Sequence, residues 1–325
     1  MCGSVLARGD EMIVKPYSKS LYLEGLVSLT KRLYPNSPKY VTVQEELKRQ
    51  LAGSYGEEVV MNAMKKVELP YQHYVFHDVC LYGNALFQID ILIITQHYAV
   101  ILEVKNIKGD VEIQNSPHQL IRTLPDGQKN SYESPVVQLN EAKYQLSKFL
   151  NHLNLPVYGA IVFAFASNHV VSPPGLVKIL FKNEIRSFLR EIPFNTPKLS
   201  QNQLTTLVNK ILNRNDPFHP FPLKKHFEIR DKDIKKGAEC LECNYIGVVR
   251  TNRKWFCPYC LQSNANVYDK ALLDYFLIFN QSINNKELRE YLGISGQYEA
   301  TRLLNRKYLI KHGTYRDARY SMKLK

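Results

Sequence analysis

The sequence predicts an α/β domain that is followed by smaller domains near the C-terminus. Residues 157–166 form a wholly apolar run, which is typical of a strand buried on both faces of a sheet. Helical and strand patterns alternate on both sides of this run, from about residue 51 to residue 215. A stretch rich in proline and aromatic residues, 216–222, then interrupts the pattern and marks a linker.

Composition places the chain among ordinary globular proteins. Its 325 residues leave room for two or three domains, and 45% of them are hydrophobic. We find no run of 18 apolar residues, and residues 1–20 lack the basic-then-apolar order of a signal peptide. We therefore expect a cytoplasmic protein without a membrane partner.

Positive charge is concentrated in the last third of the chain. The formal net charge is +13, and residues 221–325 hold 20 Lys and Arg against 11 Asp and Glu. Such an excess favours a polyanionic partner. A merely solvated basic surface is the alternative at this point.

Two apolar runs on either side of Gln96 and His97 predict a β-hairpin. If these two residues form the turn, counting outward places Asp90 opposite Glu103. Side chains alternate along a strand, so Lys105 shares a face with Glu103. One face of the hairpin thus carries three charged groups within otherwise apolar strands.

Paired carboxylates in an apolar strand point to a metal site. Unpaired charges are costly there, and Asp90 and Glu103 repel each other unless a cation lies between them. Mg²⁺ or Mn²⁺ needs one or two carboxylates together with water and substrate oxygens. Lys105 would then orient a bound water or meet developing charge. A Glu–Lys pair on the solvated face of an edge hairpin is the alternative.

The same residues carry a resemblance to a known family. The sequence resembles the nuclease-related domain called NERD, which is similar to the PD-(D/E)xK nuclease superfamily. The matching segments, in order, are Gly56-Glu57, Gln88-Ile-Asp90, Glu103-Val-Lys-Asn106, Lys108-Gly109 and Pro135-Val-Val-Gln138. The resemblance covers about residues 50–165 and implies a restriction-endonuclease-like mixed sheet flanked by helices. Two positions depart from the family pattern: Ser134 stands where Asn is usual, and Val104 where Thr is often found.

The resemblance also implies roles for individual residues. Asp90 and Glu103 would bind Mg²⁺ or Mn²⁺, and Lys105 would position the attacking water. Glu57 would face the hairpin and support the metal or its water. Gln138, early on the helix predicted for 135–153, would bond the backbone or a phosphate.

Other interpretations of two of these residues remain open. Ser54 is a plausible N-cap for a helix over 54–66, with Glu57 at the capping-box position. Glu58 would take the place of Glu57 if the helix were rotated. Gln138 suits helix capping or solvent exposure equally well.

Further elements complete the predicted α/β domain. A first strand over 70–80 contains His73 and His77, which we expect at the surface or in the core rather than as ligands. We expect Cys80 to be a small, buried hydrophobic residue. Additional strands are expected at 110–113 and 120–127, and helices at 183–191 and 200–214.

Two C-x-x-C pairs predict a zinc site. Cys240 and Cys243 are separated by 13 residues from Cys257 and Cys260, and a short hairpin pattern lies between them. Four thiolates at this spacing suit a structural, tetrahedral Zn²⁺ in a zinc ribbon. Redox-active pairs are the competing interpretation. We expect a nucleic-acid backbone to contact Arg250, Arg253, Lys254 and Trp255. The alternative is a ribbon that only helps the neighbouring domain to fold and orient.

The last 60 residues predict a winged helix-turn-helix. Helices are expected at 269–280, 286–292 (capped by Ser282) and 296–306, with a hairpin over 308–320. The predicted groove readers are Gln297, Tyr298, Arg302, Asn305 and Arg306, and the predicted phosphate contacts on or beyond the wing are Arg316, Arg319, Lys323 and Lys325. A small helical domain for protein contacts is the alternative.

Together these patterns predict a nuclease delivered to DNA by C-terminal domains. The expected divisions are an N-terminal helical extension (1–50), a nuclease-like domain (51–215), a linker (216–236), a zinc ribbon (237–264) and a winged helix-turn-helix domain (265–325). The predicted reaction is metal-dependent hydrolysis of DNA. A non-catalytic DNA-binding protein with a scaffold domain is the leading alternative, and RNA is a further candidate substrate.

Overall fold

A computed structural model of the chain describes residues 12–165, 169–173, 175, 177–194, 196–251, 254–264, 267–314 and 317–324. The chain divides into two compact units, each assembled from separate segments. The first contains residues 1–18 and 51–217, and the second contains residues 19–50 and 218–325.

A mixed six-stranded sheet forms the centre of the first unit. Its strands, in spatial order, are β1 (Ile13–Lys15), β2 (His73–Tyr82), β3 (Leu86–Thr95), β4 (Ala99–Lys105), β8 (Val157–Phe163) and β10 (Lys178–Phe181). The β2–β3 and β3–β4 pairs are antiparallel, and the other three pairs are parallel. The central strands are buried on both faces, which explains their long runs of Ile, Val and Leu.

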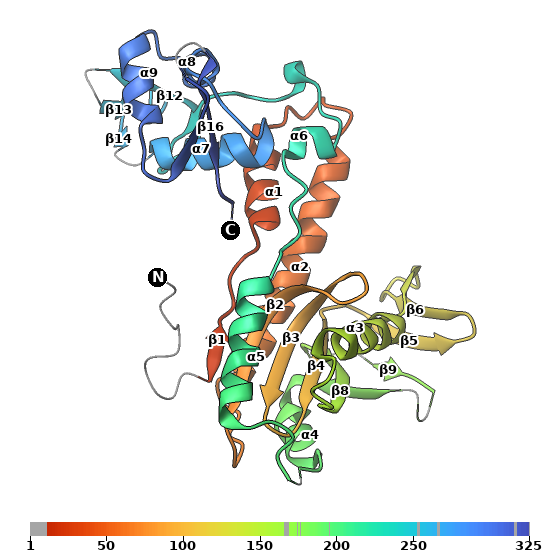
Figure 1. Cartoon of the computed structure of the whole chain (residues 1–325). Coiled ribbons are helices and arrows are strands. Elements are labelled where there is room, and N and C mark those ends of the chain that lie inside the picture. The colour runs from red at the N-terminus through yellow and green to blue at the C-terminus, as the bar shows by residue number, and fades with distance from the viewer. Residues whose placement is uncertain are drawn as a thin grey trace. The chain divides into compact units, whose positions relative to one another are not determined.

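Helices cover both faces of this sheet (Figure 1). One face packs on α2 (Tyr40–Met64) and α4 (Ile185–Glu191), and the other on α3 (Pro135–Leu150) and α5 (Gln201–Arg214). A 3-10 turn, η1 (Lys182–Glu184), precedes α4. The predicted mixed sheet flanked by helices is therefore confirmed.

The predicted hairpin has the expected register. β3 and β4 pair from Ile94 with Ala99 to Ile91 with Leu102, and the Thr95 amide donates to the Tyr98 carbonyl across the turn. Beyond Ile91 the ladder stops. Asp90 and Glu103 therefore lie where the two strands begin to separate.

A second, smaller sheet is formed mainly by the chain between β4 and α3, and a short strand that follows β8 completes it. Its strands, in spatial order, are β7 (Lys129–Glu133), β6 (His118–Thr123), β5 (Asp110–Asn115) and β9 (Val170–Val171). The chain then enters α3, whose N-cap is Ser134: its hydroxyl accepts a hydrogen bond from the Val136 amide. Serine thus supplies the capping oxygen at the position where the family usually has Asn.

Helix α2 begins much earlier than the sequence indicated. We expected a start at Ser54, but α2 runs unbroken from Tyr40 and carries Ser54 in its interior. The Ser54 hydroxyl bonds the Tyr17 hydroxyl at 2.7 Å instead of capping a helix. The N-cap interpretation of Ser54 and the capping-box interpretation of Glu57 are therefore wrong. The helix also runs through Gly53 and Gly56, because a helix tolerates glycine at a modest cost.

Gly56 is required by a close approach of the helix to the sheet. A β-carbon at this position would lie 2.6 Å from Cβ of Asn106 and 3.7 Å from Cβ of Ala164. The side chain of Asn106 in turn donates to the carbonyl of Ala52 at 2.8 Å. Helix α2 is thus held directly against the ends of β4 and β8, and this contact places Glu57 beside the sheet.

The second unit combines short strands with several helices. Its strands are β11 (Ala238–Glu239), β12 (Ile246–Thr251), β13 (Lys254–Phe256), β14 (Ser263–Asn264), β15 (Leu309–His312) and β16 (Arg319–Met322). Its helices are α1 (Leu21–Arg32), α6 (Leu223–His226), η2 (Asp231–Asp233), α7 (Val267–Ile278), α8 (Asn285–Leu292) and α9 (Gln297–Leu304). One hydrophobic core includes residues from α1, the four-stranded sheet and α7 to α9.

A buried ion-pair network ties α1 into this unit. Arg32 and Asp274, both almost fully buried, approach to 2.7 Å. Lys270 joins Asp274 to Glu239 of β11 at 3.1 and 2.8 Å. Residues 19–50 therefore belong to the same compact unit as the C-terminal segment.

Helix α8 is capped two residues later than expected. Asn284, rather than Ser282, accepts from the Glu287 amide, and Glu287 closes a capping box. The Ser282 hydroxyl instead accepts from Arg319 at 2.7 Å. Three helices followed by a hairpin match the predicted order of elements, while the winged-helix assignment and the boundaries inside this unit stay predictions.

Among the residues that the structure describes, we find no helix that combines the length and apolar content needed to span a membrane.

We predict that Gly56→Ala lowers the free energy of unfolding by about 1–3 kcal/mol, because the added methyl group overlaps Asn106 in a tightly packed contact. Gly53→Ala is the matched control in the same helix. Its nearest neighbour would be 4.0 Å away, so it should stabilise by up to about 1 kcal/mol. Urea unfolding of both variants measures the difference, and equal effects would contradict the close approach.

Candidate active site and metal centre

A kink in β2 determines where Asp90 lies. Asp78 adopts a left-handed conformation with φ 49°, which Asp tolerates better than most residues. In a regular strand Val79 would face the same side of the sheet as Val75. Val79 instead packs in the core that contains Phe76, so the alternation of side chains shifts at the kink. Asp90 occupies the facing position of β3, between the paired positions at 89 and 91.

Lys15 satisfies the carbonyl groups at this kink. Its ammonium reaches the His77 carbonyl at 2.6 Å and also bonds the Asp78 carbonyl. Burial lowers the pKa of Lys15, while nearby acidic groups, chiefly Asp78, oppose that shift. Strand β1 thus supplies a positive charge that holds the kinked backbone of β2 in place.

The carboxylate of Asp90 turns toward β4. Its Oδ2 accepts a hydrogen bond from the Val104 amide at 2.8 Å. This bond takes the place of a ladder contact after the β3–β4 pairing ends. It fixes Asp90 next to the Glu103–Lys105 segment.

Glu103, Lys105 and Gln138 form one hydrogen-bonded group. The Lys105 ammonium lies 2.7 Å from Oε1 of Glu103 and 2.8 Å from Oε1 of Gln138. Gln138 also donates to Glu133 at 3.1 Å. The side chain of Gln138, near the start of α3, therefore faces this group rather than capping the helix.

Glu57 reaches the same region from α2. Its Oε2 lies 2.8 Å from Nε2 of His77, and His77 is only 1% exposed. Burial agrees with the expectation of a core histidine, but its contact with Glu57 was not foreseen. No motif links the two residues in the sequence, because their pairing depends on α2 packing across β2.

The crowding of carboxylates changes the electrostatics of Asp90. Burial raises the pKa of Asp90 well above 3.8, and the charges of Glu103 and then Glu57 raise it further. Lys105 and the Val104 amide act in the opposite direction but do not cancel the effect. In contrast, Glu103 and Asp90 raise the pKa of Lys105 despite its burial, so this side chain stays a cation.

This arrangement suits a hard divalent cation. Asp90 and Glu103 supply two carboxylates that repel each other, and a bound cation would relieve that repulsion. Mg²⁺ requires few protein ligands and keeps several waters. The predicted residues Glu57, Asp90, Glu103, Lys105 and Gln138 are thus brought together at one end of the sheet, and their roles stay predictions.

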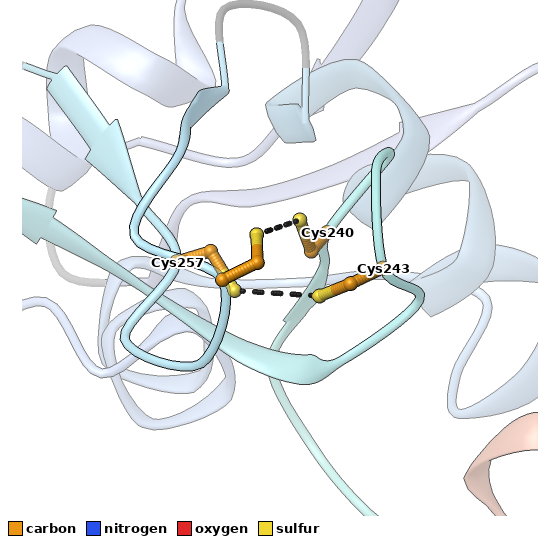
Figure 2. Close-up of side chains that lie close together, drawn as sticks. Cys240, Cys243 and Cys257 are labelled. Atoms are coloured by element: carbon orange, nitrogen blue, oxygen red, sulfur yellow. Dashed lines mark hydrogen bonds between the residues drawn. The ribbon is translucent and has the colours of Figure 1, made fainter.

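The four cysteines of the second unit form a compact cluster. Their sulfur atoms all lie within 4.8 Å of one another, with Cys240–Cys260 and Cys243–Cys257 both at 3.7 Å. Figure 2 shows the sulfurs of Cys240, Cys243 and Cys257 turned toward a common centre. A tetrahedral site with Zn–S bonds of about 2.3 Å requires sulfur separations of about 3.8 Å, so the cluster can hold zinc.

Each cysteine pair sits in the same local turn. The amide of Asn244 donates to the Cys240 carbonyl, and the amide of Leu261 donates to the Cys257 carbonyl, both at 3.0 Å. Asn244 and Leu261 both have φ 61°. This repeated turn directs the two sulfurs of each pair toward the other pair.

The residues predicted to contact DNA have different surroundings. Arg319 forms an ion pair with Glu287, with 2.8 Å between Nη2 and Oε2. The Arg306 guanidinium lies 5.5 Å from the Tyr268 ring centre. Gln297 and Arg302 are exposed on α9, and Tyr298 on the same helix is 93% exposed. Arg316 lies outside the described residues, as do Arg253 and Lys325.

Two of the ribbon residues predicted to touch nucleic acid have partners within the unit. Arg250 forms an ion pair with Glu299 and lies 5.0 Å from the Trp255 ring centre. Trp255 itself is only 4% exposed. Arg250 therefore joins the ribbon to α9, and Trp255 packs inside the unit.

Comparison with known families agrees with this geometry. Residues 52–164 match the family model NERD, the nuclease-related domain. The match begins on α2 just before Glu57 and ends directly after β8. It therefore includes every residue of the candidate active site. Neither a curated protein nor a solved structure matches the chain.

We predict that Asp90→Asn stabilises the metal-free nuclease-related domain by roughly 1 kcal/mol at neutral pH. Asparagine keeps an oxygen for the Val104 amide but removes a buried charge. Because the pKa of Asp90 is raised in the folded chain, wild type loses stability as pH rises from 3.8 through that raised pKa. The difference between variant and wild type should therefore widen with pH and then level off.

Urea unfolding without added Mg²⁺ or Mn²⁺ at several pH values measures this difference. Asp110→Asn, at an exposed position of β5, is the control and should change stability by less than about 0.5 kcal/mol. A destabilised Asp90→Asn protein at neutral pH would contradict the electrostatic account.

We predict that the purified chain carries one zinc ion, which elemental analysis can count. Cys243→Ser should lose the ion and lower the unfolding temperature, because a structural zinc site contributes directly to folding. Cys80→Ala is the control, since Cys80 lies in β2 of the other unit. A chain that contains no zinc, or that keeps it without Cys243, would refute this assignment.

Proposed function

We propose that the nuclease-related domain hydrolyses phosphodiester bonds in nucleic acid with the help of Mg²⁺ or Mn²⁺. The observation that carries the proposal is the convergence of Asp90, Glu103 and Lys105 where β3 and β4 separate. The family match supports a nuclease-like domain over the same residues.

Asp90 and Glu103 would hold the metal ion. The raised pKa of Asp90 agrees with this role, because it reflects burial first and then the charges of Glu103 and Glu57, which Lys105 does not fully offset. When bound, the ion would polarise the phosphodiester and lower the pKa of a coordinated water. Glu57, fixed by His77, would accept a hydrogen bond from such a water.

Lys105 would orient the attacking water and stabilise charge on the phosphate. A lysine ammonium has three N–H donors, and two of them point at Glu103 and Gln138. These two bonds fix the direction of the third. Water would then attack phosphorus and release a proton to solvent, the P–O bond to the leaving group would break, and the departing oxygen would take up a proton from solvent.

We further propose that the second unit binds the nucleic acid. The basic excess of residues 221–325 and the exposed face of α9 support this role. On that face, Tyr298 and Arg302 lie four residues apart and so project side by side. DNA is the favoured partner, through a winged helix and a zinc ribbon, and RNA is the second.

We expect Lys105→Met and Glu103→Gln each to slow cleavage by at least about 100-fold, because each removes charge stabilisation or a metal ligand. Initial rates with Mg²⁺ or Mn²⁺ on linear, circular and single-stranded DNA, and on RNA, measure the effect. Lys129→Met, at an exposed position of β7, is the matched control and should cleave like wild type.

The same assays also distinguish a nuclease from a non-catalytic nucleic-acid-binding protein. Binding without cleavage by wild type would favour a non-catalytic scaffold. Cleavage that survives both active-site substitutions would place the chemistry elsewhere. Arg302→Glu should weaken substrate affinity without changing the rate at saturating substrate, because α9 carries none of the proposed active-site residues.

A further inference from the structure

Two aromatic side chains stack beside the candidate active site. The rings of Tyr55 and Phe165 lie 5.8 Å apart, with an angle of 26° between their planes. Tyr55 is on α2, two residues before Glu57. Phe165 lies two residues after the end of β8. Tyr55 is 54% exposed, while Phe165 is partly buried against the core beneath α2.

Backbone contacts place this pair next to the candidate active-site residues. The amide of Ala164 donates to the carbonyl of Lys105 at 3.0 Å, and Phe165 is the next residue along the chain. On the helix side, the close packing of Gly56 on Asn106 sets the position of Tyr55. Both contacts are made at the end of β4 that carries Lys105, so the aromatic pair lies next to the backbone of the candidate active site.

A positive charge accompanies the two rings. The ammonium of Lys182, at the start of η1, lies 5.1 Å from the ring centre of Phe165. Aromatic rings next to a cation suit single-stranded nucleic acid, because bases stack on the rings while the cation meets the phosphate. Core packing accounts for Phe165 but not for Tyr55, whose ring stays more than half exposed.

We propose that Tyr55 and Phe165 form a stacking site for an unpaired nucleobase next to the scissile phosphate, with Lys182 meeting its backbone. This inference rests on the proposed function and narrows its substrate to single-stranded nucleic acid or an unpaired end. A base within a duplex is already stacked on its neighbours and cannot occupy the site. Base stacking does not distinguish DNA from RNA, so both belong to this substrate class.

The test measures binding without cleavage. Fluorescence anisotropy with the full chain in Ca²⁺ gives the Kd for a labelled single-stranded oligonucleotide and for a blunt duplex of equal length. Both DNA and RNA forms are used. Tyr55→Ala should weaken single-strand binding about 10-fold or more, because each stacked base contributes substantially to such complexes. Tyr55→Phe should bind like wild type, and duplex binding should change less than about twofold.

Tyr144→Ala is the matched control. Tyr144 is 49% exposed on α3, with the Lys148 ammonium 5.0 Å from its ring centre, but it neighbours Asn84 rather than the active-site residues. It should bind both ligands like wild type. If Tyr55→Ala unfolds more readily than wild type, Tyr55→Leu replaces it, since leucine keeps apolar bulk without a stacking face.

Three results would overturn the inference. These are wild-type affinity of the Tyr55 variant for single strands, an equal loss on the blunt duplex, and an equal loss with Tyr144→Ala. In each case metal-dependent cleavage that requires Glu103 would leave the proposed nuclease intact. Absence of both cleavage and nucleic-acid binding in wild type would instead reject the proposed function together with the stacking site.

Discussion

Repulsion among buried carboxylates is the constraint on which the candidate site depends. Asp90 and Glu103 lie on neighbouring strands, and Glu57 approaches from α2. Burial, and then the charges of Glu103 and Glu57, raise the pKa of Asp90. Lys105 offsets part of this repulsion through its contact with Glu103. A fold that served stability alone would gain from apolar residues at such positions. We therefore propose that a bound cation balances these charges.

Several unusual local features keep these groups together. The left-handed Asp78 changes the faces of β2, Lys15 bonds the carbonyls at that kink, and Gly56 lets α2 approach β4 and β8. Each feature is unfavourable or unremarkable by itself. Together they bring groups from α2, β3, β4 and α3 to one end of the sheet. The functional geometry thus depends on backbone irregularities as much as on the charged side chains.

Much of this arrangement could be predicted from local patterns. Alternation and turn position gave the register of β3 and β4, because the Gln96-His97 turn fixes which residues face each other. Cysteine spacing likewise predicted the sulfur cluster. The start of α2 and the Glu57–His77 contact could not be predicted, because both depend on tertiary packing. Ser54 has the chemistry of an N-cap, and only the preceding chain shows that the helix has already begun.

We propose that Asp90 and Glu103 share a divalent cation. Crystals of wild type and Asp90→Ala grown in Mn²⁺ test this proposal, because manganese gives an anomalous scattering signal. We expect an anomalous peak between the Asp90 and Glu103 carboxylates in wild type and its loss in the variant. A wild-type map without that peak at saturating Mn²⁺, with Lys105 still bonded to Glu103, would contradict it.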